Sequence, residues 1–423
     1  MMAVPPMAPL RAAQPAEAWD TSLHREIGDR APKDLRGFYA ARGNRPLWIT
    51  FAGRPSAAAL RFVAILRDAG LDGLDADKFK PEKLEKQLAK APGASVKDRA
   101  KAELALSSAY VRYVQAVREA PRSDMTYETQ ALAPVVPTPA AALSALAAAP
   151  SLENYVRDMG WMTPFYAPLR SALAARRLSP AQADSAILNL ARLRALPPIP
   201  SGQWVLIDAA SARLWMFEGP RVAGTMKVVV GTRQTQTPEM AGFLRYAIVN
   251  PYWNMPDSLL PSRITEKVLA NGPGYLATHR YQVLNGWEED AEVVDPTQVD
   301  WEAVAAGQAT VRARQLPGAG NFMGSVKFMF PNPQGIYLHD TPERNLLAKP
   351  ARQYSNGCVR LEDAQRFGKW LMGKPLPRSR KPETRVELPV IVPIYITYLT
   401  AQPEKGRVAF HADVYGRDVL NGG

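Results

Sequence analysis

The spacing of apolar residues changes near residue 202, and this change constrains the fold more than any other feature. Before it, Ala58–Ala69 and Ala100–Glu119 carry apolar residues three and four positions apart, which predicts helices. After it, apolar and polar residues alternate in Trp204–Asp208, Arg213–Phe217 and Thr225–Val230, which predicts strands. Helices followed by strands indicate an α+β fold with a mainly β second part.

The length of 423 residues and the 47% share of hydrophobic residues allow two or three packed domains. We expect a disordered tail at 1–18, a helical domain at 19–200 and a β domain at 201–423. Within the helical domain, residues 131–150 are expected to be an Ala/Pro linker or a loose helix. Residues 251–325 interrupt the β pattern with Pro, Gly and Trp, as either a surface insertion or a functional cap, and long irregular segments favour the cap.

The net charge of +12 suits an anionic surface such as a wall polymer, membrane headgroups or nucleic acid. The basic residues form no nucleic-acid motif, so we expect no nucleic-acid partner. The most apolar stretch, Val386–Thr400, is short and contains Pro389 and Pro393, so we expect no membrane insertion. One cysteine and four histidines argue against an internal disulfide and a structural zinc site, and no metal or cofactor is expected.

The single cysteine, Cys358, and His339 are close enough in sequence to meet through one loop. A thiol becomes a nucleophile near neutral pH when a base assists it. We predict a strand at Gly335–His339 and a helix at Glu362–Met372, whose start would lower the thiol pKa. Backbone N–H groups near Gly357 could bind an oxyanion. The alternative, a buried apolar cysteine and a core histidine, fits poorly with the Ser, Asn, Gly and Arg around Cys358.

These residues resemble the signature of the L,D-transpeptidases with a YkuD-type catalytic domain. The large Gram-negative members with a capping subdomain are similar over most of 200–420, and Leu35–Trp48 resembles their scaffold segment. The segments that carry the resemblance are Asn250–Pro256, Gly272–Leu276, Tyr337–Pro342, Ser355–Arg360 and Asp413–Asp418. Asn356 stands where the family usually has histidine, and asparagine cannot titrate. The fifty residues 151–200 are too few for the family's usual wall-binding module, so we expect it to be absent.

The resemblance implies a mainly β catalytic sandwich with an inserted cap at about 251–325 and a helical scaffold domain before it. It implies Cys358 as nucleophile and His339 as base, with the carbonyl of Asp340 orienting His339 and the N–H of Gly357 helping to hold the oxyanion. The expected substrate-binding residues are Arg360, Ser355, Asn356, Tyr337 and Trp253. Packing is an alternative role for Tyr337 and Trp253.

The implied reaction joins peptidoglycan peptide stems by 3→3 cross-links through a cysteine acyl-enzyme. Water could replace the amine acceptor, giving an L,D-carboxypeptidase or an amidase that releases a protein from the wall. A wall-anchored protein is a further possible acceptor. A non-catalytic wall-binding scaffold is a further alternative, against which both His339 and Cys358 argue, and a papain-like order would place Cys before His. The resemblance implies a periplasmic location, although Met1–Leu10 has no pattern of a secretory signal and looks like the start of a trimmed chain.

Overall fold

The computed structural model describes residues 21–119, 123–198, 200–288 and 290–418, so the tail expected at 1–18 lies outside the described residues. The chain divides into two compact units. The first runs to residue 117 and includes 136–159, and the second comprises 118–135 and 160–423. Residues 160–200, expected with the helical domain, therefore group with the β part, because Asn189 of α9 (Pro180–Arg194) hydrogen-bonds Thr400 beside the last strands.

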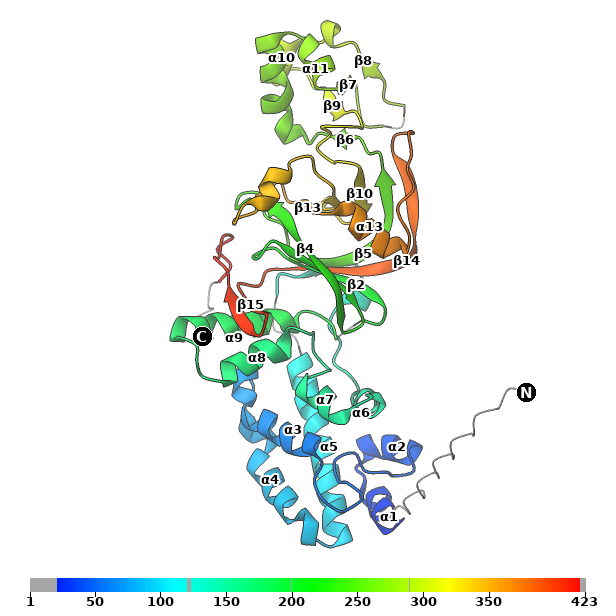
Figure 1. Cartoon of the computed structure of the whole chain (residues 1–423), viewed down its shortest axis with the longest axis vertical. Helices are drawn as coiled ribbons and strands as arrows, with labels where there is room; N and C mark the ends of the chain where they lie inside the picture. Colours follow the sequence, from blue (N-terminus) through cyan, green and yellow to red (C-terminus); the bar gives the residue numbers. More distant parts are fainter. Residues whose placement is uncertain (1–20, 120–122, 199, 289, 419–423) are drawn as a thin grey trace, which may run out of the picture. The chain divides into compact units, whose positions relative to one another are not determined.

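The first unit is helical, as the apolar spacing predicts. The described helices are α1 (Thr21–Arg30), α2 (Lys33–Ala41), α3 (Ala57–Arg67), α4 (Pro81–Lys90), α5 (Val96–Arg118, ending at the unit boundary), α6 (Pro139–Ala148) and α7 (Leu152–Arg157) (Figure 1). The two helices predicted here match α3 and α5. In the segment 131–150, Thr138 caps α6, Pro139 occupies its first turn, and Leu143 and Leu146 are buried, so this segment contains a packed helix.

A buried carboxylate ties the first helices to α5. Glu103 is fully buried and accepts the N–H groups of Leu47, Trp48 and Ile49 at 2.6, 2.9 and 3.0 Å and the hydroxyl of Tyr39 at 2.7 Å. All four partners are donors, which matches a carboxylate that only accepts. Burial raises the pKa of Glu103, and these hydrogen bonds oppose that shift.

We expect Glu103→Ala to lower the free energy of unfolding by about 3–5 kcal/mol, because it leaves buried donors unpaired. Urea denaturation followed by circular dichroism measures the change. The control is Glu85→Ala, which removes a pair with Arg67 in which both side chains are more than half exposed. Its loss of stability should be much smaller, because water screens an exposed pair. Equal losses in the two variants would contradict the assigned role of Glu103.

The second unit is built on one sheet of ten strands in the described chain (Figure 1). β14 is parallel to β2 and antiparallel to β5, and it pairs with both. The sheet therefore curls back on itself around one apolar core. The predicted α+β fold with a mainly β catalytic part is confirmed. The strands are β1 (Thr126–Tyr127), β2 (Gln203–Asp208), β3 (Arg213–Glu218), β4 (Arg221–Gly231), β5 (Met240–Val249), β10 (Val326–Met329), β11 (Leu338–His339), β12 (Gln353–Ser355), β13 (Val359–Leu361) and β14 (Thr384–Thr397).

Two predicted elements beside Cys358 differ from the structure. The strand expected at Gly335–His339 contains only β11, because Gly335 has a φ of 64° and turns the chain. The helix expected from Glu362 is α13 (Ala364–Met372), whose N-cap is Asp363. Cys358 directly precedes β13 rather than the helix. The predicted lowering of its pKa by a helix start therefore does not apply.

The insertion 251–325 forms a lobe with its own sheet and core (Figure 1). Its strands β6, β9, β7 and β8 are covered by short helices around a buried cluster that includes Trp253, Ile264 and Val283. The elements are β6 (Trp253–Asn254), a π-helical turn (Pro261–Thr265), α10 (Glu266–Asn271), α11 (Gly274–Thr278), β7 (Tyr281–Leu284), β8 (Val293–Val294), α12 (Trp301–Ala305) and β9 (Arg312–Gln315).

The remaining described helix and strands of the second unit are α8 (Tyr166–Ala174), β15 (Ala401–Glu404) and β16 (Arg407–Phe410), and β15 pairs with β16 in a separate hairpin. None of the described helices is long and apolar enough to cross a bilayer. The described residues also hold no cluster of three or more His, Cys, Asp or Glu side chains suited to a metal ion.

Candidate active site

The turn before Cys358 is held in place by hydrogen bonds of its own residues. The Ser355 hydroxyl donates to the carbonyl of Cys358 at 2.6 Å and accepts the N–H of Gly357 at 3.2 Å. Gly357 has a φ of 109°, a conformation that other residues rarely adopt. Since the N–H of Gly357 is engaged inside the turn, this residue shapes the turn and is not a free oxyanion donor.

A second layer of contacts fixes this turn from outside. Thr237 donates its hydroxyl to the carbonyl of Gly357 at 2.7 Å, and Thr235 donates to the carbonyl of Ser355 at 3.0 Å. The hydroxyl of Tyr415 in turn bonds the carbonyl of Gly231 at 2.8 Å and accepts the N–H of Thr237 at 3.3 Å. The sequence analysis named none of these threonines, because single threonines in a loop carry no pattern.

Cys358 is half-buried at the end of this turn. Its Sγ lies 3.7 Å from the carbonyl oxygen of Gly335, to which the thiol donates. Burial raises the pKa of the Cys358 thiol, while the N–H and hydroxyl of Tyr337 and the charge of Arg360 partly oppose this shift. A raised pKa disfavours the thiolate, so Cys358 needs a base before it can act as a nucleophile.

His339 is buried at the end of β11, and its ring is oriented by the main chain. Its Nδ1 lies 2.6 Å from the carbonyl oxygen of Asp340. A carbonyl only accepts, so Nδ1 carries the proton and Nε2 is left as a base. Burial and the neighbouring Arg360 lower the pKa of His339 to about 3, which keeps the imidazole neutral in the resting site.

Tyr337 contacts both candidate catalytic residues. Its ring centroid lies 5.8 Å from that of His339, and its phenol interacts with the Cys358 thiol. Tyr337 also packs against the apolar cluster of the cap. Among the described residues, no hydrogen bond joins His339 to Cys358. Catalytic hydrogen bonds often tighten only when substrate binds, so the thiol has to turn from Gly335 toward the imidazole.

The predicted substrate-binding residues differ in their exposure and in their contacts. Arg360 lies opposite His339 in the pairing of β11 with β13 and forms an ion pair with Glu343. Asn356 is exposed beside Cys358. Trp253 is 6% exposed and packs in the cap core, with its ring centroid 4.6 Å from that of Phe322. This packing matches the alternative role given for Trp253, and substrate binding by this residue stays a prediction.

The raised pKa of Cys358 predicts slow alkylation at neutral pH. We expect the rate of iodoacetamide modification to rise with pH up to a midpoint above the ordinary thiol value of about 8.5. The loss of Cys358 thiol with time, followed by intact mass between pH 6 and 10, measures this midpoint. The control is Arg360→Gln, which removes a charge that favours the thiolate and should move the midpoint further up. A midpoint below 7 in the unmodified chain would contradict the raised pKa of this thiol.

Comparisons with known proteins assign these residues to a family. A model described as the L,D-transpeptidase catalytic domain matches residues 202–392. This chain carries an L,D-transpeptidase catalytic domain. A second model, described as a scaffold domain, matches residues 33–173. The family resemblance in the sequence is therefore confirmed for both parts, and the L,D-transpeptidase domain contains Cys358 and His339.

Similarity to one curated relative agrees with this assignment. A Haemophilus influenzae protein named "Putative L,D-transpeptidase" is 31% identical over 239 residues, which cover 55% of this chain and 47% of that protein, so the match spans about half the relative's length. Solved structures include an L,D-transpeptidase from Mycobacterium smegmatis (12% identity, 47% of this chain and 59% of that one, TM-score 0.24) and the Ldtfm–avibactam carbamoyl enzyme (11% identity, 48% and 51%, TM-score 0.23).

Proposed function

We propose that the L,D-transpeptidase domain of this chain forms 3→3 cross-links in peptidoglycan through an acyl-enzyme on Cys358. The family assignment supplies the reaction class, and a tetrapeptide stem is the proposed donor. The observation that carries the proposal is that a half-buried thiol and a histidine whose Nδ1 is held by a carbonyl both contact the side chain of Tyr337. The proposed setting is the periplasm, with peptide stems or a wall-anchored protein as acceptors.

In the first step, Nε2 of His339 takes the proton of Cys358 and the sulfur attacks the stem's scissile carbonyl carbon. The tetrahedral oxyanion is held by backbone N–H groups. The proposed donor is the N–H of Cys358, which has no acceptor among the described residues. The N–H of Tyr337 interacts with the sulfur in the substrate-free site and would become available when the sulfur attacks. Collapse breaks the amide bond, and the proton on His339 goes to the leaving D-alanine amine, which leaves a thioester.

In the second step, an amine of another stem attacks the thioester carbon. Its proton passes to Nε2 of His339, the C–S bond breaks, and the regenerated thiolate takes the proton from His339. Water in place of the amine would give hydrolysis by the same route. Burial disfavours the imidazolium, which makes proton removal from the thiol uphill, so we propose that His339 takes this proton as the sulfur attacks the carbonyl carbon.

The roles proposed for the flanking residues follow from their contacts. Ser355 fixes the turn through the carbonyl of Cys358, and Arg360, paired with Glu343, sets the potential at both catalytic residues. Asn356 is exposed two residues before Cys358 and can hydrogen-bond substrate without titrating. Because the Asn356 side chain cannot titrate, we propose that proton transfer at this position is not needed and that asparagine can replace the usual family histidine.

The test is the intact mass of the protein after incubation with purified disaccharide tetrapeptide, with the products analysed in parallel. We expect a mass increase equal to the donor minus D-alanine, confined to the peptide with Cys358, together with a cross-linked dimer. An adduct with tripeptide alone would redirect the proposal to hydrolysis. The absence of both the adduct and any product would overturn the proposal.

A further inference from the structure

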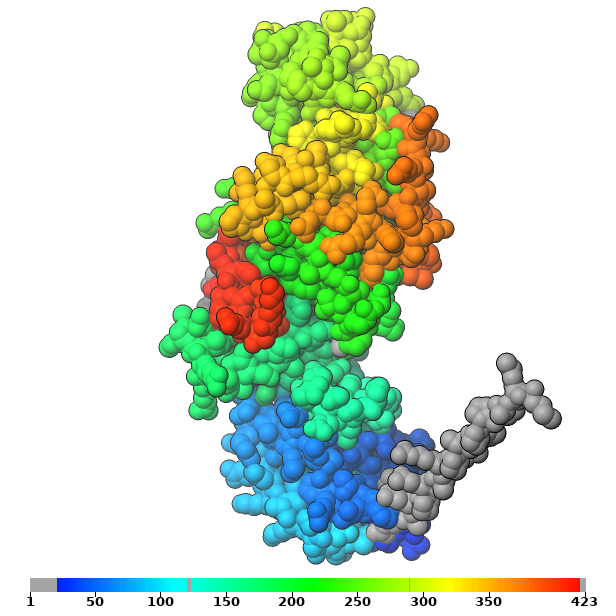
Figure 2. Space-filling model, in the orientation of Figure 1, coloured from blue at the N-terminus to red at the C-terminus, as the bar shows by residue number. Residues whose placement is uncertain are grey.

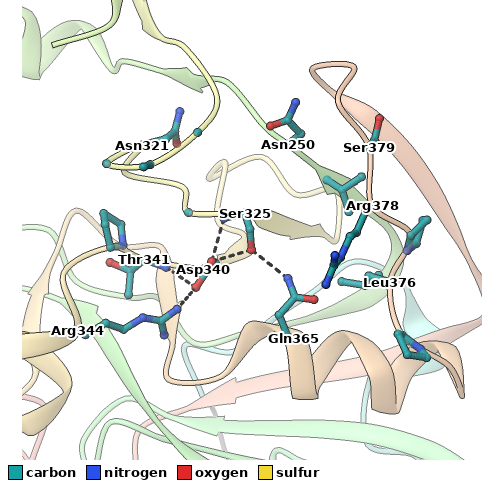
Figure 3. Close-up of a pocket in the computed structure, with 18 residues that line it drawn as sticks. Asn250, Asn321, Ser325, Asp340, Thr341, Arg344, Gln365, Leu376, Arg378 and Ser379 are labelled. Carbon is teal, nitrogen blue, oxygen red and sulfur yellow. Dashed lines mark hydrogen bonds and ion pairs between the residues drawn. The ribbon is translucent and has the colours of Figure 1, made fainter. Parts of the chain in front are cut away.

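A cavity of about 820 Å³ lies where the end of the cap meets the sheet, and it is separate from the thiol (Figure 3). Neither Cys358 nor His339 lines it. Its walls come from four parts of the second unit: the end of β5 with Asn250, the cap end (residues 318–325), the segment after His339, and α13 with the residues that follow it. Figure 2 shows the yellow cap end and the orange α13 region meeting on one face.

The size and lining of the cavity are those of a polar ligand site. Small-molecule pockets commonly measure about 300–1,000 Å³ and carry a few convergent polar groups. Here these groups are the side chains of Asn250, Ser325, Arg344, Gln365 and Arg378. The backbone of Gly318–Gly320 adds the N–H groups of Ala319 and Gly320, which have no acceptor among the described residues.

The cavity lining carries more positive than negative charge, because it includes two arginines and one carboxylate. Its carboxylate, Asp340, is already saturated: Oδ2 accepts the N–H and hydroxyl of Ser325 at 2.9 and 2.8 Å, and Oδ1 accepts the N–H of Thr341 at 2.9 Å and Arg344 at 2.5 Å. Arg378 is exposed and has no ion pair or hydrogen bond within the described part of the chain. Figure 3 shows its guanidinium directed toward Gln365 across the cavity.

We propose that this cavity is a second ligand site that takes a carboxylate on Arg378, and that its occupancy is transmitted to His339 through Asp340. An arginine fork matches a carboxylate in two parallel hydrogen bonds, and the amide of Gln365 offers a further polar partner at the same wall. The carboxylate can belong to a free small acid or to a peptide stem.

The transmission follows from the contacts of Asp340. Its carboxylate forms part of the cavity wall, whereas its carbonyl holds Nδ1 of His339 at 2.6 Å. Gln365 reaches the same cluster, because its Nε2 donates to the Ser325 hydroxyl at 3.0 Å. Gly324 and the Asp340 carboxylate are closely packed, because a Cβ added to Gly324 would lie 2.5 Å from Cγ of Asp340. A ligand that moves Gln365 or Arg344 therefore moves the residue that orients the base.

Binding is tested by calorimetry on the full chain with two separate probes, citrate and the stem tripeptide L-Ala-γ-D-Glu-diaminopimelate. We expect at least one probe to bind, and Arg378→Gln to weaken it by about tenfold or more, as for the loss of a charge-assisted pair. The matched control is Arg380→Gln, an exposed arginine two residues away that does not line the cavity. It should bind like the unaltered chain.

Each outcome of the binding test has one meaning. Citrate binding alone assigns a free acid, and tripeptide binding that is lost in Arg378→Gln assigns the stem. No binding of either probe, or equal binding by Arg378→Gln, would overturn the site. Arg378 is exposed, so its replacement should leave the thermal unfolding temperature unchanged.

Transmission to His339 is tested without turnover, by iodoacetamide alkylation of Cys358 at a fixed pH with and without the bound probe. We expect the probe to change the rate at least about threefold in the unaltered chain and in Arg380→Gln, and not in Arg378→Gln. An unchanged rate at saturation would refute the transmission. Because neither assay requires cross-linking, their failure is distinct from failure of the proposed reaction.

Discussion

Cys358→Ala should abolish acyl-enzyme formation and lower cross-linking at least about 10³-fold, because the chain has one cysteine and no other thiol can replace it. Intact mass and product analysis with disaccharide tetrapeptide measure both effects. The fold should persist, since the Ser355 and Thr237 hydrogen bonds that hold this turn end on main-chain atoms.

The control for this variant is Ser355→Ala, which keeps the thiol but removes the hydroxyl that bonds the carbonyl of Cys358. We expect it to retain a Cys358 adduct at a reduced rate. If Cys358→Ala forms more cross-linked product than a control reaction without protein, this thiol is not the nucleophile. Loss of circular dichroism signal in Cys358→Ala would show instead that the residue is needed for folding.

His339→Gln should lower the rate of adduct formation by about 10²–10⁴, the range typical of a lost general base. The amide of glutamine can still reach a carbonyl acceptor but cannot take a proton from the thiol. Single-turnover kinetics between pH 6 and 10 measures the effect. Part of the lost rate should return at high pH, because hydroxide then generates the thiolate whose pKa is raised by burial.

A matched control for the base is Tyr337→Phe, which removes the phenol beside the thiol but leaves His339 and both candidate oxyanion N–H groups. We expect a loss much smaller than that of His339→Gln. A larger loss in Tyr337→Phe would assign proton transfer to the phenol. No dependence of the His339→Gln rate on pH would contradict the role of His339 as the base for Cys358.

The sequence predicts the helical first part and the β second part because alternation and helical spacing are local properties. α3, α5 and β2 to β4 lie within a few residues of their predicted ranges. Boundaries are less local: α9 follows the helical pattern before residue 200 but hydrogen-bonds Thr400 through Asn189. A pattern of apolar residues shows that a helix buries one face, not which unit receives that face.

Some expected contacts could not be inferred from the sequence. Trp253 lies in a motif shared with the family and is a core residue of the cap. Arg360 was expected to face substrate and is paired with Glu343, whose position depends on the loop after Asp340. The carboxylate of Asp340, which had no evident role, joins Ser325, Thr341 and Arg344 at the second cavity.

The sequence by itself determined the fold class and the types of side chain at the candidate site. Apolar spacing, a single cysteine and one histidine motif are local features that can be identified from neighbouring residues. Only the tertiary structure decided the directions in which the pKa values of Cys358 and His339 shift, the engagement of the Gly357 N–H and the existence of the cavity beside Asp340. These depend on desolvation and on hydrogen bonds between segments distant in sequence, and burial by distant segments leaves no local pattern.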